Sequence, residues 1–309
     1  MRVILVFIDG VGLGDQDDHN PFYYFKPPGL LNILEGNFFT ASTSGFSGHK
    51  ATLSSLDACL GTPGYPQSAT GQASIFTGVN AAGYLGKHLN GFPNRKLREL
   101  LAKKGIFANL KQKGYSVCFA NAYRPAFFEL LAEGLPGDCY SCSTLVTYYG
   151  GVKFFGFPEL IKGQALYMDI TNGLLSNMDD DLPLVTPEQG AEILLTISRD
   201  YDFCLFEYFL SDLAGHFGDY DQIVKVIETL DLFIGTLAER INMEETLLII
   251  CSDHGNLEDS SFNEHTLNRV PLLLIGTSEL RQEIASRSRD LTAIINAVEL
   301  GLAWNGDDQ

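Results

Sequence analysis

The chain has 309 residues, of which 45% are hydrophobic and 19% charged, enough apolar material for a large core and too much for a disordered protein. Its 21 Lys and Arg against 38 Asp and Glu give a formal net charge of −17 at pH 7. Because a field of this sign repels nucleic-acid backbones and anionic membrane surfaces, we expect a small-molecule partner, with no nucleic acid and no membrane involved.

Short apolar runs rich in β-branched and aromatic residues alternate with helical patterns along the chain. The runs predict five buried strands, at Val3–Ile8, Tyr115–Ala120, Phe203–Tyr208, Leu247–Cys251 and Pro271–Ile275. The helical patterns cover Lys96–Lys104, Ile106–Lys113, Pro187–Ser198, Gln222–Arg240 and Asp290–Leu302. This alternation predicts an α/β fold, a doubly wound and mostly parallel central sheet with helices on both faces.

One stretch interrupts the alternation. Residues 123–162 are rich in Gly, Pro, Tyr and Phe and show no sustained period, which indicates a small lid-like insert or an excursion over the sheet edge. No other feature suggests a domain boundary, so we expect a single domain over residues 1–309.

The compartment is predicted from the first apolar run and the cysteines. Six residues, Val3–Ile8, are too few for the core of a signal peptide or for a membrane span. The six cysteines have no regular spacing, and Cys139-x-x-Cys142 lacks the second pair that a zinc knuckle needs. We therefore expect reduced cysteines and a cytoplasmic location.

Polar residues follow the predicted strands at the edge where parallel sheets collect their ligands. Asp9 follows the first strand, where neighbouring glycines allow a cation to approach; a turn aspartate is the alternative. Asp212-x-x-x-His216 follows Phe203–Tyr208, and an i,i+4 spacing places both side chains on one face of a helix.

Two further segments extend this set. Asp253-His254 directly follows Leu247–Cys251, and His265 lies shortly before Pro271–Ile275. Any one histidine alone is more simply a surface or hydrogen-bonded residue. Three of them together with three aspartates favour metal binding instead.

The set divides into two groups by chemistry. Two nitrogens and one carboxylate, the pattern of a catalytic metal with an open position, come from Asp212, His216 and His265. A harder, more oxygen-rich group consists of Asp9, Asp253 and His254. Two divalent ions about 3.5–4 Å apart can polarise a phosphoryl oxygen and activate a nucleophile together. Zinc or manganese would suit these ligands.

A candidate nucleophile lies in Ser68-Ala69-Thr70-Gly71-Gln72. The segment predicts a turn entering a helix, where free N–H groups bind anions. Deprotonated by a bound metal, Ser68 would attack phosphorus. A helix-capping hydroxyl is the alternative, and Thr70 is a second candidate.

The order Asp9, Ser68, Asp212-x-x-x-His216, Asp253-His254, His265 resembles the metal and nucleophile set of the alkaline phosphatase superfamily. The most similar branch contains the cofactor-independent phosphoglycerate mutases and phosphopentomutases. The resemblance covers residues 1 to about 125 and about 186 to 280. It implies an alkaline-phosphatase-like core in which Ser68 is the nucleophile. By the same resemblance, Ser68 joins Asp9, Asp253 and His254 at one metal, and Asp212, His216 and His265 hold the other.

The chain also departs from this pattern. The mutases usually have Gly-His where this chain has Gly71-Gln72, and they carry a large cap where only residues 123–162 are available here. The Cys/Ser-x-Pro-x-Arg signature of sulfatases is absent around Ser68. Two further residues, His88 and Arg124, are weaker candidates for contacting the substrate, Arg124 through its planar guanidinium.

We predict a two-metal phosphoesterase that hydrolyses a small phosphate ester through a phosphoserine on Ser68. A phosphomutase acting on a phosphosugar or phosphoglycerate-like substrate is the alternative, and it requires a cap that excludes water. A non-haem iron oxygenase would use Asp212, His216 and His265 but leaves the other residues unexplained. A metal-binding scaffold without turnover is a further alternative. The substrate and the oligomeric state are not predicted.

Overall fold

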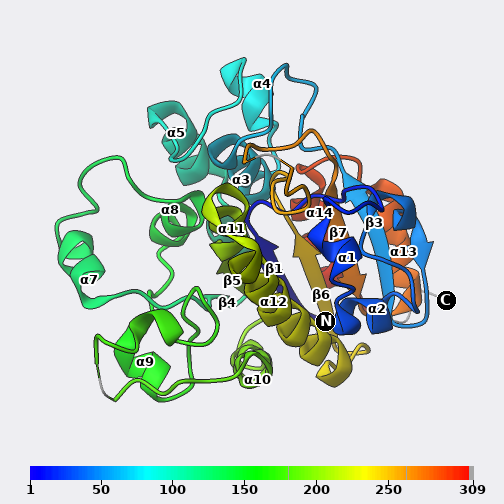
Figure 1. Cartoon of the computed structure of the whole chain (residues 1–309). Helices are drawn as coiled ribbons and strands as arrows, with labels where there is room; N and C mark the ends of the chain where they lie inside the picture. The colour runs from blue at the N-terminus through cyan, green and yellow to red at the C-terminus, as the bar shows by residue number, and fades with distance from the viewer. Residues whose placement is uncertain (180, 262, 306–309) are drawn as a thin grey trace.

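The fold is built around one central sheet, seen in a computed structural model that describes residues 1–179, 181–261 and 263–305 (Figure 1). The seven strands lie in the order β2-β3-β7-β6-β1-β5-β4. Their bounds are β1 Arg2–Ile8, β2 Phe46–Ser47, β3 Ala51–Leu56, β4 Val117–Phe119, β5 Phe203–Tyr208, β6 Thr246–Cys251 and β7 Val270–Ile275. The predicted α/β class is confirmed.

Helices cover both faces of the sheet, because successive side chains of each strand point to opposite faces. In β1, Ile4, Val6 and Ile8 belong to one hydrophobic core. The helices contributing to that core are α1 (Pro21–Tyr24), α2 (Pro28–Ile33), α9 (Phe157–Ile161), α10 (Pro187–Ser198), α11 (Leu210–Phe217) and α12 (Tyr220–Arg240). The sheet therefore separates this core from a second one.

The second core contains the alternate residues of β1, Val3, Leu5 and Phe7. Its helices are α3 (Ser68–Thr77), α4 (Ala81–Leu85), α5 (Arg95–Lys104), α6 (Ile106–Gln112), α7 (Pro125–Ala132), α8 (Cys142–Tyr149), α13 (Ser278–Arg287) and α14 (Ala293–Ala303). Two 3-10 turns, Ala41–Thr43 and Gly173–Leu175, complete the regular structure.

All five predicted strands and all five predicted helices are present, most of them within two residues of their predicted ends. The proposed start of the helix at Pro187 is also confirmed, since Thr186 caps α10 and exchanges hydrogen bonds with Gln189. The sheet is parallel from β6 through β1 and β5 to β4, whereas β7 runs antiparallel to β6. The segment 252–269 consequently begins and ends at the same edge of the sheet.

Residues 123–162 form three helices, α7, α8 and α9, beside the edge strand β4 (Figure 1). The chain there is tied to the sheet region by an isolated bridge between Ala122 and Phe155. Helix α8 packs on α3 and α5, and its Leu145 and Val146 are fully buried in the second core. At least α8 is therefore part of the packed body and not a detached lid.

All six cysteines are free thiols. Cys118 and Cys204 are paired in register on β4 and β5, and a hydrogen bond between them together with burial raises the pKa of Cys118. Such a thiol is unreactive, because the thiolate is the reactive form. Among the described residues, no helix combines the length and apolar character needed to cross a bilayer.

Candidate metal and nucleophile site

Seven side chains that the sequence singled out meet at the carboxyl edge of the sheet. They are Asp9 after β1, Ser68 at the start of α3, Asp212 and His216 on α11, Asp253 and His254 after β6, and His265 before β7. The antiparallel direction of β7 explains the last of these, because the loop that precedes this strand remains at the edge where β6 ends.

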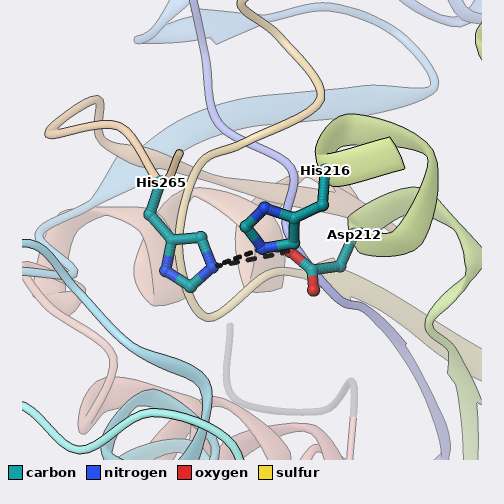
Figure 2. A group of neighbouring side chains, drawn as sticks. All are labelled: Asp212, His216 and His265. Atoms are coloured by element: carbon teal, nitrogen blue, oxygen red, sulfur yellow. Dashed lines mark hydrogen bonds and ion pairs between the residues drawn. The ribbon is translucent and has the colours of Figure 1, made fainter. Parts of the chain in front are cut away.

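The first group consists of Asp212, His216 and His265 (Figure 2). The Asp212 Oδ1 atom lies 3.5 Å from His216 Nε2 and 3.7 Å from His265 Nε2. The two Nε2 atoms are 3.1 Å apart. Helix α11 supplies Asp212 and His216 from one face, as the i,i+4 spacing predicts.

The second nitrogen of each ring fixes how these histidines face one another. His216 Nδ1 is 2.8 Å from the carbonyl of Asn263, and His265 Nδ1 is 2.8 Å from the carbonyl of Pro66. A carbonyl accepts only, so each Nδ1 carries the proton and donates it. In the neutral rings, both Nε2 lone pairs then point toward each other and toward Asp212, an arrangement that fits a shared cation.

The second group surrounds His254. Its Nε2 atom lies 3.2 Å from Asp9 Oδ1, 3.6 Å from Asp253 Oδ2 and 3.1 Å from Ser68 Oγ. Both of those carboxylate oxygens are buried and accept no hydrogen bond from any described residue. Since buried acceptors are ordinarily satisfied, a cation fits here as well. Asp212 also lies within reach of Asp9 and His254, so it stands between the two groups.

The pKa shifts of the ionisable groups at this edge also indicate that a positive charge would be stabilised here. Burial raises the pKa of Asp253, and the neighbouring Asp9 raises it further. Burial alone would lower the pKa of His254, but Asp253 and Asp9 raise it to about 10. Burial and the positive charge of His254 lower the pKa of His265 to about 4. The carboxylates thus attract a proton to His254, which a divalent ion would displace on binding.

Ser68 is the first helical residue of α3 and not its cap. Gln67 occupies the capping position, and its side chain makes no capping hydrogen bond. The Ser68 hydroxyl instead faces His254. The other hydroxyl considered, Thr70, donates to the carbonyl of Gln67 at 3.1 Å and is engaged in its own helix.

Several residues that support the site were not predicted. Gln72, which stands where the mutases usually have His, donates its Nε2 to Asp9 Oδ2 at 3.0 Å. Asn256 Nδ2 donates to Asp212 Oδ1 at 2.8 Å. The buried Glu258 accepts from the backbone N–H groups of Gly12 and Asn256, both at 2.7 Å. The only feature of the sequence that pointed to Asn256 and Glu258 is that they follow the Asp253-His254 motif within a few residues.

A cavity of about 290 Å³ adjoins Ser68 and is lined by residues of both groups. Its wall includes Glu207, at the end of β5, whose Oε2 accepts from Ser143 Oγ at 2.6 Å. Burial raises the pKa of Glu207 to about 7. The sequence did not reveal this residue, because it reads as part of the apolar run Phe203–Tyr208.

The two weaker candidates lie apart from these groups. His88 Nε2 is hydrogen-bonded to the carbonyl of Thr62 at 3.1 Å. The cavity beside Ser68 is lined by Gly91 and Phe92 of the same loop, and not by His88. Arg124 lines a second, adjacent cavity and donates its Nε to the hydroxyl of Tyr167 at 2.7 Å.

Comparison with known proteins finds similarity to a metalloenzyme family and to phosphoglycerate mutases. Residues 179–302 match the family described as the metalloenzyme superfamily. A 2,3-bisphosphoglycerate-independent phosphoglycerate mutase of Yersinia pestis is 29% identical over 210 residues, which cover 63% of this chain and 40% of that enzyme. The enzyme of the same name from Desulforudis audaxviator is 30% identical over 112 residues, or 34% of this chain and 21% of that one. The chain thus spans less than half the length of these relatives.

Solved structures share the fold over nearly the whole chain. An alkaline phosphatase from the Antarctic bacterium TAB5 superposes with a TM-score of 0.53 at 14% identity, covering 98% of each chain. A protein from Pyrococcus horikoshii gives a TM-score of 0.53 at 15% identity, covering 89% of this chain and 85% of that one. At these identities the likeness establishes the fold alone.

Proposed function

We propose that the chain is a two-metal phosphoesterase, on the premise that residues 179–302 match the metalloenzyme superfamily and that the fold is similar to that of an alkaline phosphatase. Its substrate would be a small phosphate ester, and Ser68 would be the nucleophile. The observation that carries the proposal is the position of Ser68 Oγ, 3.1 Å from His254 Nε2 and beside buried carboxylate oxygens that accept no hydrogen bond from the described residues.

The donor atoms fit two divalent ions. One ion would be held by Asp212, His216 and His265, and the other by Asp9, Ser68, Asp253 and His254. When bound, the ions would polarise the phosphoryl oxygens and lower the pKa of the Ser68 hydroxyl. The mixed nitrogen and oxygen donors suit zinc or manganese, and the local positive charge offsets the repulsion between an anionic ester and a protein of net charge −17.

The reaction has two steps. Ser68 Oγ attacks phosphorus in line with the leaving oxygen, so that a bond from phosphorus to Oγ forms and the ester bond breaks, and the leaving alcohol takes up a proton. Water then attacks the phosphoserine, the bond to Oγ breaks, inorganic phosphate departs and Ser68 regains its proton. The chain's contribution is mainly positioning, as is usual for phosphoryl transfer.

A phosphomutase is the second candidate, because the matched curated relatives carry that name. A mutase returns the phosphoryl group to another oxygen of its substrate and must keep water away from the phosphoserine. We favour hydrolysis because residues 123–162 stand where the mutases have a large cap. This segment is held against the body of the protein by its helix α8, whose Leu145 is buried in the second core.

The test combines metal analysis with product analysis. We expect two divalent ions per chain by elemental analysis, and phosphate release from a panel of small phosphate esters. Ser68→Ala should lower phosphate release at least about 10³-fold, whereas Ser286→Ala, on the exposed face of α13, should leave it unchanged. Acid quenching during turnover should yield a peptide phosphorylated at Ser68.

Two results would contradict the proposal. Undiminished hydrolysis by Ser68→Ala would exclude the covalent route, and an isomerised ester without free phosphate would establish the mutase. The proposed cytoplasmic location rests on the free thiols of the chain and is tested separately, by fractionation of the source cells.

A further inference from the structure

A second cavity, of about 500 Å³, adjoins the one beside Ser68. The two cavities share part of their walls, since Ser141, Glu207 and Phe209 line both. A ligand with its phosphoryl group at Ser68 can therefore extend past these three residues into the second cavity. This direction offers one path for the part of an ester that leaves.

Four aromatic side chains line the second cavity. Tyr123 and Phe127 are stacked with their ring centroids 4.0 Å apart, and Tyr167 and Phe209 also line the cavity. The Tyr123 hydroxyl is engaged with Thr144 Oγ1 at 2.7 Å, so its polar end already has a partner. Walls of this kind favour a flat ring that can pack against aromatic faces.

The lining of the second cavity also includes one positively charged side chain, that of Arg124. Arg124 is the only Lys or Arg that lines either cavity in the described part of the chain. Its Nε donates to the Tyr167 hydroxyl at 2.7 Å, and its guanidinium carbon lies 5.6 Å from the centre of the Tyr167 ring. The side chain is thus oriented by a neutral partner, and no described carboxylate forms an ion pair with it.

The Arg124 side chain is exposed, so its guanidinium is accessible to a ligand. The terminal nitrogens of Arg124 retain their donors for an anion, and a planar carboxylate matches them in two parallel hydrogen bonds. The aromatic side chains and Arg124 together fit a ligand that has both a flat ring and a carboxylate.

We propose that the second cavity binds the leaving group of the substrate, and that this group is a flat ring bearing a carboxylate that pairs with Arg124. The inference rests on the proposed phosphoesterase activity for its place in the reaction. Its binding chemistry, however, depends only on Arg124 and the aromatic walls, so the two are testable apart.

The test compares four esters with the metal-loaded protein: phenyl phosphate, 4-carboxyphenyl phosphate, ethyl phosphate and the phosphate monoester of 3-hydroxypropionate. We expect kcat/KM to rise about tenfold with the ring and about tenfold with the carboxylate. In Arg124→Gln, the ratio of kcat/KM for 4-carboxyphenyl phosphate over phenyl phosphate should fall from about ten to about one. Arg95→Gln, whose side chain is exposed on α5, should keep the ratio of the unaltered protein.

Binding of the leaving alcohol separates the two proposals. By NMR titration, 4-hydroxybenzoate should bind more tightly than phenol, and Arg124→Gln should remove the difference. If no ester is hydrolysed but this pattern holds, the phosphoesterase fails and the ligand chemistry stands. A ratio unaffected by Arg124→Gln, equal use of ring and alkyl esters, or equal binding of the two alcohols would overturn the inference.

Discussion

At the scale of single residues, Gln72 shows how a departure from the mutase pattern is accommodated. Its Nε2 donates to Asp9 Oδ2, while Asp9 Oδ1 is left facing His254. A group that orients a metal-binding carboxylate usually contributes a factor of 10–100 to metal affinity. We therefore expect Gln72→Leu to weaken binding of one of the two ions by about that factor, measured by competition with a coloured chelator.

The control for this prediction is Gln282→Leu, an exposed position on α13. It should leave both metal affinities unchanged. If Gln72→Leu also retains both affinities, the orientation of Asp9 does not depend on the amide.

Glu207 gives a prediction about pH. Burial raises its pKa from 4.5 to about 7, so the folded protein retains a proton that the unfolded chain releases between these values. Stability is consequently lost as the pH rises through this window, and the loss is complete above about pH 7. Gln keeps an acceptor for the Ser143 hydroxyl and removes the ionisation. At about 1.4 kcal/mol per pKa unit, Glu207→Gln should be more stable than the unaltered protein at pH 8 by on the order of 3–4 kcal/mol.

Urea unfolding in the presence of a chelator measures this difference at pH 5 and pH 8. We expect a much smaller gain at pH 5, where the Glu207 carboxyl stays protonated in the folded protein. Glu129→Gln, exposed on α7, should show no such pH dependence. An equal effect of Glu207→Gln at both pH values would indicate that the carboxyl is not held protonated.

The sequence revealed residues of the site unevenly, for a physical reason. Asp253, His254 and the Asp212–His216 pair are visible because polar ligands directly after apolar strands are unusual locally. Gln72 and Glu207 are not visible, because one lies in a helix and the other in a strand, and each role depends on a partner far away in the chain. Contacts of this kind follow from tertiary packing and not from local pattern.

At the scale of elements, the close approach of α3 to the loop after β6 positions the nucleophile. A Cβ atom at Gly71 would lie 2.8 Å from both the carbonyl oxygen and the Cβ of Asp253. Gly71→Ala must therefore push the helix and the loop apart. We expect a loss of about 1–3 kcal/mol in the free energy of unfolding and a clear fall in phosphate release, since Ser68 and Asp253 would separate.

Gly235→Ala in α12 is the matched control. Its Cβ would meet the Cα of Gly29 at 3.4 Å, an ordinary contact, and Ala is preferred over Gly inside a helix. This variant should be as stable as the unaltered protein or up to about 1 kcal/mol more stable, with full activity. If Gly71→Ala behaves in the same way, close packing of α3 on the loop is not what holds the site.

Elements were predicted well where both faces are apolar and poorly elsewhere. All five apolar runs are strands, but β3 was missed, because its Ser54 and Ser55 are half-buried and interrupt the apolar pattern. Helix α13 was missed for a similar reason, since its side chains are mostly polar and few of them, such as Leu280 and Ile284, are buried. The direction of β7 could not be predicted either, because an apolar run carries no information on its orientation.

At the scale of the whole molecule, one sheet joins two cores, and this predicts cooperative unfolding. The cores meet at the same strands, and residues 123–162 contribute Leu145 and Val146 to one of them. The segment has no core of its own that would let it unfold separately. We expect a single calorimetric transition in which the calorimetric and van't Hoff enthalpies agree, as a single domain requires.

Leu145→Ala tests this coupling from within the segment. Leu145 is 1% exposed, so truncation should cost about 2–5 kcal/mol through lost burial and the cavity left behind. Because the segment and the sheet unfold together, the whole transition should move to lower temperature without dividing. Ile161→Ala, at a side chain that is 45% exposed, should shift it little. Appearance of a separate low-temperature transition in Leu145→Ala would instead establish residues 123–162 as an independent unit, and the single-domain prediction would be wrong.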